Sequence, residues 1–380
     1  MDFSFSKDQD LLRKAVREFV EAEVAPMAAR WDEEDTCPLG VFRKLGELGF
    51  VGAFVPAEYG GAGLGYTERA IIIEEIARHS AGFAMFVMTH HLAVAALLEF
   101  GSEEQKKKYL PDLATGKKVS ALLVTEPTGG SDLAGHQSTG EPVDGGWALN
   151  GRKCFASNSH VADVNVITVK TGTDEKGRAT LTAFIVESGN PGLSLGRKEN
   201  KLGLRVSIMG DLIMNNCRVG SGAILGGEGK GQRVALSTIS EVGRAGMSAI
   251  SLGILRACLE DMVKFAKDRK LYGKPISALQ AIQFSIAETR IEYEAARLLT
   301  YSALSLKDAK KRCDVELAMA KYFSSEAAVK AAKRNMDNMG GYGVLNDYPA
   351  GRYMRDALAT LPSAGTSNIM KVIVAAGTLA

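Results

Sequence analysis

The stretch Val124-Thr125-Glu126-Pro127-Thr128-Gly129-Gly130-Ser131-Asp132 stands where the hydrophobic pattern of the chain changes. From residue 6 to about 120, apolar residues recur at helical spacing behind an N-cap at Ser6. From about 121 to 225, short β-branched runs lie between Gly, Asn and Asp turns. After Gly231 the long helical periods return. This order of helices, strands and helices predicts an α+β fold.

The same pattern divides the chain into three domains. We expect a helical domain at 1–120, a β-domain at 121–230 and a second helical domain at 231–380. In the first domain, Thr67 is expected to cap a helix, and a second, apolar helix covers about 81–99. The last domain should contain helices at about 232–269, 277–306, 314–338 and 366–378.

Composition excludes several classes of protein. A net charge of +2, with both signs mixed along the chain, gives no reason to expect nucleic acid as a partner. The five cysteines are scattered and include no C-x-x-C pair, which argues against a disulfide framework and a zinc site, so no metal is expected. No signal peptide is read at the N-terminus, and the apolar runs are too short or too interrupted to span a bilayer. We therefore expect a cytoplasmic protein with no membrane segment.

Residues 124–132 have the chemistry of a cofactor-binding loop. A strand that ends in a turn with exposed hydroxyls and free backbone donors suits a flavin ring edge or a phosphate. Turn residues are common, so the stretch alone could equally be an ordinary turn. Three further stretches stand in register with it: Asn150-Gly151-Arg152-Lys153-Cys154-Phe155-Ala156-Ser157-Asn158, Asp268-Arg269-Lys270-Leu271-Tyr272-Gly273-Lys274-Pro275-Ile276 with Gln280, and Met339-Gly340-Gly341-Tyr342-Gly343.

Each of these stretches can be interpreted physically. Asn150-Gly151 indicates a hairpin turn. Arg269 offers a planar fork that can donate two bonds to one diphosphate, although an arginine at a helix end is often only a solvated cap. Closely spaced glycines at 340–343 let a backbone approach a dinucleotide, or simply end a helix.

Together the four stretches, in their order and at their intervals, resemble the acyl-CoA dehydrogenases, a family of flavoproteins that desaturate acyl-CoA thioesters. The resemblance covers nearly the whole chain. It implies an N-terminal α-helical domain, a middle β-domain and a C-terminal four-helix bundle, with one FAD per subunit in a homotetramer or dimer of dimers. No G-x-G-x-x-G stretch opens a βαβ unit, which agrees with a family that does not bind FAD through a Rossmann domain.

The resemblance also implies residue roles. Substrate would be bound by Ser131, beside the CoA portion, and by Arg244, near the CoA chain. Asp337 departs from the family, which usually has glutamine there, and a carboxylate near a diphosphate would be mildly repulsive. The residues implied to bind FAD are Leu123, Thr125, Ser131, Phe155, Ser157, Arg269, Tyr272, Gln280, Asp337, Gly341, Thr366 and Asn368.

The catalytic base of the family is missing. In most members a glutamate directly before a Gly-Thr pair removes the proton alpha to the thioester carbonyl, but here Ala364 precedes Gly365-Thr366. A minority place the glutamate at the start of the long helix after the β-domain, where this chain has Gly243, next to Arg244. Both positions therefore lack a group that can take a proton.

Three substitutes remain open. Glu241 lies two residues before Gly243, but two residues along a helix turn a side chain to another face. His90 or His91, on the apolar helix at about 81–99, could act as the acid/base because histidine titrates near neutrality. Alternatively, no protein base is needed, because the reaction is not ordinary desaturation.

The resemblance thus implies an FAD-dependent oxidoreductase that acts on an acyl-CoA thioester, by α,β-desaturation or the reverse enoyl-CoA reduction, with electron-transfer flavoprotein as redox partner. It leaves open a desulfinase-like member, an oxygen-using flavin enzyme, and a catalytically inactive partner subunit of a heteromeric acyl-CoA dehydrogenase. The small residues Ala359, Ser363 and Ala364 suggest room beside the flavin for a branched, cyclic or charged acyl group.

Overall fold

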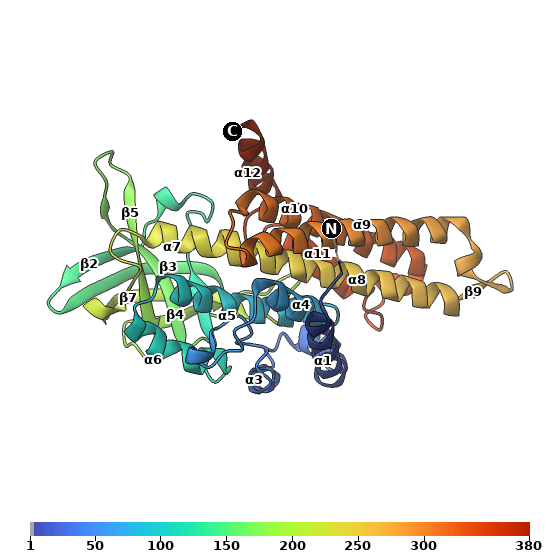
Figure 1. Cartoon of the computed structure of the whole chain (residues 1–380), viewed down its shortest axis with the longest axis horizontal. Helices are drawn as coiled ribbons and strands as arrows, with labels where there is room; N and C mark the ends of the chain where they lie inside the picture. The colour runs from blue at the N-terminus through green and yellow to red at the C-terminus, as the bar shows by residue number, and fades with distance from the viewer. Residues whose placement is uncertain (1–3) are drawn as a thin grey trace.

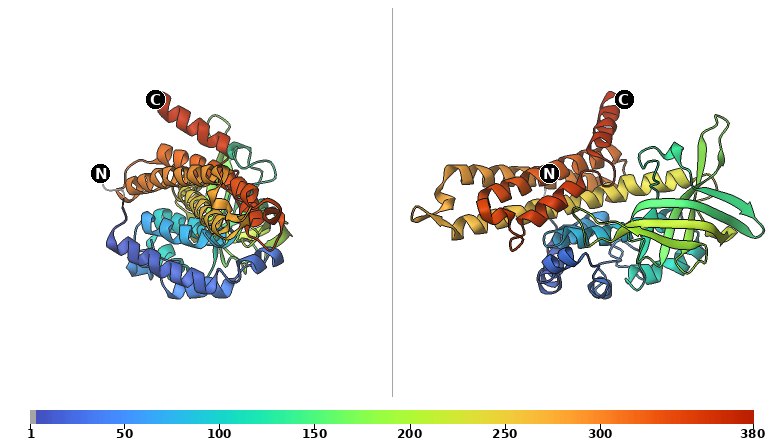
Figure 2. Two further views of the ribbon diagram at one scale, coloured as in Figure 1. Left: turned by 90° about the vertical axis from the view of Figure 1, so that its right-hand side faces the viewer. Right: turned by 180° about the vertical axis from the view of Figure 1, so that it is seen from behind.

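The computed structural model describes residues 4–380, apart from the side chain of Ala134, and has an elongated shape. A β-domain forms one end, long helices of the C-terminal domain run to the other, and the N-terminal helices lie along one side (Figures 1 and 2). The predicted α+β class, with helices, then strands, then helices, is confirmed.

Six α-helices make up the N-terminal domain: α1 (Lys7–Glu23), α2 (Ala28–Glu34), α3 (Leu39–Glu47), α4 (Tyr66–Ala77), α5 (Ala81–Phe100) and α6 (Glu103–Ala114). Ser6 caps α1 as predicted. Its hydroxyl accepts the backbone N–H of Gln9, and the Gln9 side-chain oxygen accepts the backbone N–H of Ser6. The cap predicted at Thr67 is wrong. Helix α4 begins at Tyr66, and the Asp308 carboxylate accepts the backbone N–H groups of Tyr66 and Thr67.

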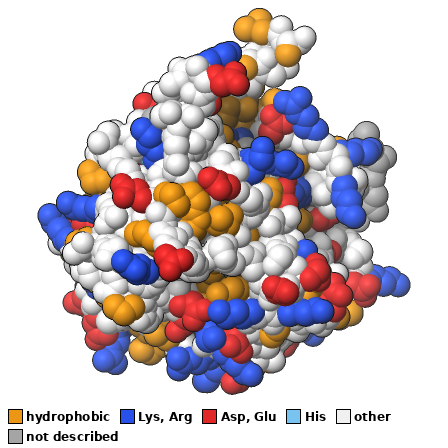
Figure 3. All heavy atoms as spheres, turned by 90° about the vertical axis from the view of Figure 1, so that its left-hand side faces the viewer, with side chains coloured by type: hydrophobic (Ala, Val, Ile, Leu, Met, Phe, Trp, Pro, Cys, Tyr) orange, Lys and Arg blue, Asp and Glu red, His pale blue; other side chains and the backbone are white. Residues whose placement is uncertain are grey.

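An eight-stranded mixed sheet forms the middle domain, in the order β6-β7-β3-β2-β4-β5-β8, with β1 pairing in parallel with β4. The predicted hairpin at Asn150-Gly151 is wrong, because both residues lie inside β3, at an irregularity in its pairing with β7. Gly151 has φ +130°, and a Cβ there would lie 2.4 Å from the Ser138 hydroxyl oxygen, so the glycine allows a close approach. The strands are β1 (Ser120–Leu123), β2 (Thr139–Val143), β3 (Gly146–Ser157), β4 (Val164–Thr173), β5 (Ala179–Glu187), β6 (Leu193–Lys198), β7 (Met209–Gly220) and β8 (Ile224–Leu225). Hydrophobic side chains gather on the surface at this end of the molecule (Figure 3).

The C-terminal domain is helical. Helix α7 (Gly231–Thr238) continues through a π-helical turn at Ile239–Gly243 into α8 (Arg244–Asp268). After the short strands β9 (Lys270–Leu271) and β10 (Lys274–Pro275) come α9 (Gln280–Asp308) and α10 (Asp314–Met339), which pack against α8. Helix α11 (Ala350–Thr360) was not predicted, and α12 (Ser367–Leu379) stands out from the body (Figure 1).

Among the residues that the structure describes, two helices are long and apolar enough to cross a membrane by length and composition alone, although the sequence predicted that every apolar run would be too short or too interrupted. They are Ala81–Phe100 and the continuous helix Gly231–Asp268, and 83% and 100% of their most apolar windows are buried in the protein. Such burial is typical of core helices, which pass the same test. Both helices contribute to one large apolar core that runs from the N-terminal helices into the sheet.

A buried ionic cluster joins the N-terminal helices to α8. The Glu75 carboxylate lies 2.7 Å from Arg13 Nε and 2.5 Å from Arg256 Nη1, and it also accepts hydrogen bonds from Arg17. Burial alone would raise the pKa of Glu75, but these arginines lower it to about 2. The cluster therefore fixes α1, α4 and α8 relative to one another.

Candidate active site

Phe155 projects from the sheet at a break in strand β3. Its side chain is 59% exposed, and its backbone has φ +52°, a left-handed conformation that is uncommon for an aromatic residue. The pairing of β3 with β7 shifts between Lys153 and Ala156, which lets the chain turn Phe155 outward. A strained backbone and an exposed aromatic ring together indicate a surface that binds a flat ligand.

The loop at 124–132 lies directly beside Phe155. The Thr125 carbonyl accepts the backbone N–H of Cys154 at 3.0 Å, and the Thr125 side chain is half-buried. Ser131 is exposed and Ser157 is half-buried, so both hydroxyls can reach a ligand. Leu123 is buried, with 1% of its surface exposed, so only its backbone could serve the implied role.

A buried ion pair braces this loop, and sequence reasoning gave it no role. Lys153 Nζ lies 2.5 Å from the Glu126 carboxylate and also donates to the Val124 carbonyl. Glu126 in turn accepts the backbone N–H groups of Gln137 and Ser138. Burial would raise the pKa of Glu126, but the bond from Lys153 holds it below its usual range. The sequence carried one signal for this pair, because Glu126 lies in the stretch 124–132 and Lys153 lies in the stretch 150–158.

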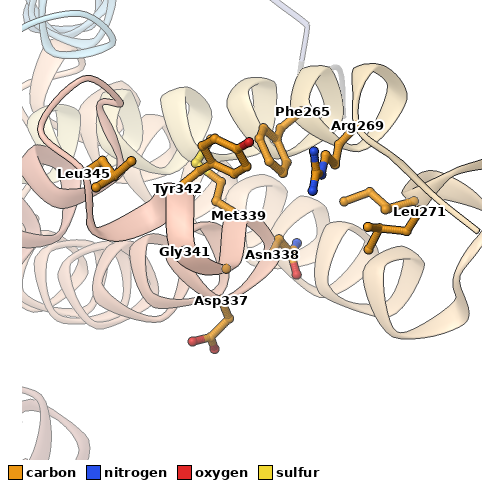
Figure 4. Close-up of a pocket in the computed structure, with 11 residues that line it drawn as sticks. Phe265, Arg269, Leu271, Asp337, Asn338, Met339, Gly341, Tyr342 and Leu345 are labelled. Atoms are coloured by element: carbon orange, nitrogen blue, oxygen red, sulfur yellow. The ribbon is translucent and has the colours of Figure 1, made fainter.

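A second group of implied cofactor residues lines a pocket of about 460 Å³ at the far end of α8 (Figure 4). The Arg269 guanidinium lies 5.3 Å from the centre of the Tyr342 ring, and Gly341 also lines this pocket. Asp337 is exposed, points away from Arg269 and pairs with Lys333 Nζ at 2.6 Å, so its charge is balanced locally. Tyr272, which is 96% exposed, and Gln280 extend this end of the molecule.

The two groups lie far apart in one chain. Helix α7 packs against strands β4 and β5 of the β-domain, whereas Arg269 caps the far end of α8, whose 25 residues span about 37 Å. A single chain therefore presents two separate partial sites, one with Phe155 and one with Arg269.

Gly243 and Ala364, the two positions where the resemblance would place a base, face each other. A Cβ built on Gly243 would lie 3.5 Å from the Cβ of Ala364 and 3.5 Å from Leu92 Cδ2. Gly243 ends the π-helical turn, a rare element that often marks functional sites. Ala364 has φ +54°, another left-handed outlier. Neither backbone feature was predicted from the sequence.

A buried lysine holds the loop that carries Ala364. Lys321 Nζ donates to the carbonyls of Leu361 at 2.7 Å and Gly365 at 2.8 Å. Burial lowers the pKa of Lys321 to about 8. After the loop, Thr366 caps α12 by accepting the Ile369 backbone N–H, and Asn368 is exposed. Lys321 is a positioning residue that the sequence did not reveal.

His90 and His91 are both fully buried and fully hydrogen-bonded. His90 Nδ1 accepts the backbone N–H of Ser120, and its Nε2 lies 3.1 Å from the Leu113 carbonyl. His91 Nδ1 accepts from Arg69 Nε, and its Nε2 lies 2.8 Å from the Val51 carbonyl. Burial lowers the pKa of His90 to about 4, and burial followed by the Arg69 charge lowers the pKa of His91 well below its usual range. Both rings are neutral with each nitrogen engaged, so an acid/base role for either stays a prediction that these bonds do not favour.

Two charged residues lie beside Gly243 in the sequence, the candidate base Glu241 and the implied substrate ligand Arg244. Glu241 pairs with Lys307 and accepts from Ser237. Arg244 is 9% exposed, donates weakly to the Asp314 carbonyl and leaves its Nε without a partner. That free donor agrees with the implied role of Arg244 in binding substrate.

Comparison with known proteins covers the whole chain. Family models for the N-terminal, middle and C-terminal domains of acyl-CoA dehydrogenase match residues 6–117, 121–217 and 229–379. An acyl-CoA dehydrogenase of Bacillus subtilis is 40% identical over 370 residues, 97% of each chain. The acryloyl-CoA reductase (NADH) of Anaerotignum propionicum is 38% identical over 377 residues, 99% of this chain and 95% of that one. The structure of butyryl-CoA dehydrogenase from Megasphaera elsdenii superposes with a TM-score of 0.97 at 34% identity, covering 100% of both chains.

Proposed function

This chain belongs to the acyl-CoA dehydrogenase family, and from that membership we propose that it reduces an enoyl-CoA thioester, taking the α-proton from water. That it is an FAD-dependent oxidoreductase of acyl-CoA thioesters follows from the family itself. The observation that carries the proposal is the pairing of Gly243 with Ala364, where neither side chain can exchange a proton.

The residues of the two partial sites fit FAD. Phe155 offers an exposed ring, Thr125 and Ser157 offer hydroxyls, and Arg269 offers a charged fork for a diphosphate. When bound, FAD supplies or accepts the hydride at the β-carbon of the substrate. Because Phe155 and Arg269 lie far apart in one chain, we propose that Arg269, Tyr272 and Gln280 complete the site of a partner subunit in a homotetramer or dimer of dimers.

The proposed direction of the reaction rests on how the proton at the α-carbon is handled. Desaturation requires a base within hydrogen-bond reach and with a pKa near the working pH. Near Gly243, the carboxylate of Glu241 pairs with Lys307, both ring nitrogens of His91 are hydrogen-bonded, and Arg69 and Arg244 are cations that cannot accept a proton. Reduction requires a proton donor at the α-carbon instead of a base. The α-carbon becomes strongly basic as hydride reaches the β-carbon, so water can protonate it. The arrangement thus favours reduction, with electrons delivered by an electron-transfer flavoprotein in the cytoplasm.

Proton exchange in D₂O tests this proposal. We expect the oxidised enzyme to leave the α-protons of butyryl-CoA unexchanged, and the reduced enzyme to convert crotonyl-CoA to a product with one solvent deuterium at the α-carbon. Rapid α-exchange by the oxidised wild type would show that a protein base exists and would refute the proposal. Loss of such exchange in His91→Gln or His90→Gln would then assign the base to that histidine.

The same pairing of Gly243 and Ala364 also fits a second candidate, a non-catalytic subunit that supports a different, active chain. Purified protein separates the two. A yellow homo-oligomer that turns over crotonyl-CoA supports the enzyme, whereas a colourless chain that gains flavin only with a second gene product supports the inactive subunit.

A further inference from the structure

Arg69 is a fully buried arginine at the junction of three helices. It projects from α4, and none of its surface is exposed. Its Nε donates to His91 Nδ1 of α5 at 3.1 Å, and its Nη1 donates to the Val242 carbonyl at 3.3 Å. The Phe54 ring lies 5.7 Å from the guanidinium carbon. The side chain is therefore held in one place by neutral groups.

No carboxylate balances this charge among the residues that the structure describes, and the Arg69 Nη2 has no hydrogen-bond partner. The contrast with Arg13 and Arg256 is clear, since both of those pair with Glu75. An unpaired buried cation is strongly unfavourable, and burial lowers the pKa of Arg69 to about 10. An anion that reached Arg69 would offset this cost.

The free end of Arg69 lies between α5 and α8. A Cβ built on Gly246 would lie 3.0 Å from Arg69 Nη2 and 2.3 Å from Met88 Cγ, so these three residues meet closely. The Nη1 atom contacts Val242, the residue next to Gly243, which faces Ala364. The guanidinium thus lies within a short reach of the place where the thioester would react.

We propose that Arg69 binds a carboxylate at the far end of the acyl group, so that the substrates are monothioesters of short dicarboxylic acids. This inference rests on the proposed acyl site at Gly243 and Ala364. Nη1 keeps one hydrogen beyond its bond to Val242, and Nη2 keeps two. Together they form the planar fork that binds a carboxylate through two bonds. The short distance between Gly243 and Arg69 limits the acyl group to a few carbons.

Binding to the oxidised holoenzyme tests the inference without any turnover. Dissociation constants are measured by calorimetry for matched thioesters, succinyl-CoA against butyryl-CoA and glutaryl-CoA against valeryl-CoA. We expect the carboxylated member of at least one pair to bind about tenfold tighter or more, the range of a charge-assisted pair. Equal or weaker binding of both carboxylated thioesters would overturn the inference.

Variants identify the residue responsible. Arg69→Met should abolish the preference for the carboxylated thioester, and Arg69→Lys should retain part of it. The matched control is Arg78→Met, which removes an arginine from the end of the same helix that pairs with Glu21 and Glu260, and it should keep the full preference. A preference that survives in Arg69→Met would overturn the assignment. If Arg69→Met does not fold, the wild-type comparison still tests whether carboxylated thioesters bind more tightly, and Arg69→Lys still tests whether Arg69 is responsible.

The outcome is independent of the proposed reduction. A wild type that prefers carboxylated thioesters but fails to reduce enoyl-CoA supports the inference and refutes the proposed function. One that reduces crotonyl-CoA with no preference for a carboxylated thioester supports the function and refutes the inference.

Discussion

Placing a carboxylate at position 364 should give this protein the dehydrogenase reaction that its own residues do not support. Ala364 already has φ +54°, so a longer side chain adds no new backbone strain. Its Cβ lies 3.5 Å from where a Cβ of Gly243 would be, so glutamate at either position reaches the same space. A positioned general base contributes roughly 10²–10⁴-fold to proton abstraction. We therefore expect Ala364→Glu to desaturate a saturated acyl-CoA about 10²–10⁴-fold faster than wild type, a barrier lower by about 2.7–5.5 kcal/mol.

The assay is the rate of flavin bleaching after anaerobic mixing with butyryl-CoA and, separately, succinyl-CoA. Ala364→Gln is the matched control, because it has the same shape and cannot take a proton. Gly243→Glu should act similarly, since Gly243 has a helical φ of −67° and its nearest neighbours would stand at ordinary contact distance. An Ala364→Glu variant that carries flavin, melts like wild type and bleaches no faster than Ala364→Gln would refute the reasoning.

Three further predictions concern the cofactor and stability. Arg269→Ala should weaken FAD binding by about tenfold or more, because the guanidinium that can donate two bonds to a diphosphate is lost. Arg269→Lys should restore only part of that affinity, and flavin release on dilution measures the affinity of both variants. Burial raises the pKa of Asp356 to about 6, so its charged form costs stability that grows as pH rises from about 4 through 6. Asp356→Asn, which keeps an acceptor for the Leu204 N–H, should therefore be more stable by about 2–3 kcal/mol at pH 7 and no more stable near pH 4, as thermal melts would show. Glu75→Gln should lose about 3–5 kcal/mol at pH 7, because it removes the buried carboxylate that Arg13, Arg17 and Arg256 share, and the difference should shrink as pH falls from about 4 toward 2; urea unfolding at several pH values tests this.

The sequence predicted the α+β layout because helical and strand periodicities are local properties, and they change near residues 121 and 231. It failed where distant contacts override a local signal. Asn150-Gly151 is a strong turn signal, yet pairing with β7 and the approach of Ser138 keep both residues inside a strand. Thr67 looks like a helix cap, but the Asp308 carboxylate from α9 does the capping.

The sequence predicted some residues of the candidate site but not their long-range contacts. The motifs identified Thr125, Phe155 and Arg269 as cofactor residues, and the resemblance implies that Arg269 acts across a subunit interface; these roles stay predictions. Burial of His91 was foreseeable from its apolar helix, whereas its bonds to Arg69 and Val51 are long-range. Arg69 itself carried one usable signal, a charge directly before the apolar run at 70–73.

The distance between Phe155 and Arg269 has a genetic consequence. If two subunits share each cofactor, a chain with Phe155→Ala still offers an intact Arg269, and a chain with Arg269→Ala still offers an intact Phe155. A mixed dimer of the two then has one site assembled from undamaged halves and one that carries both defects. Two alleles that are inactive alone would therefore restore activity when co-expressed, as intragenic complementation.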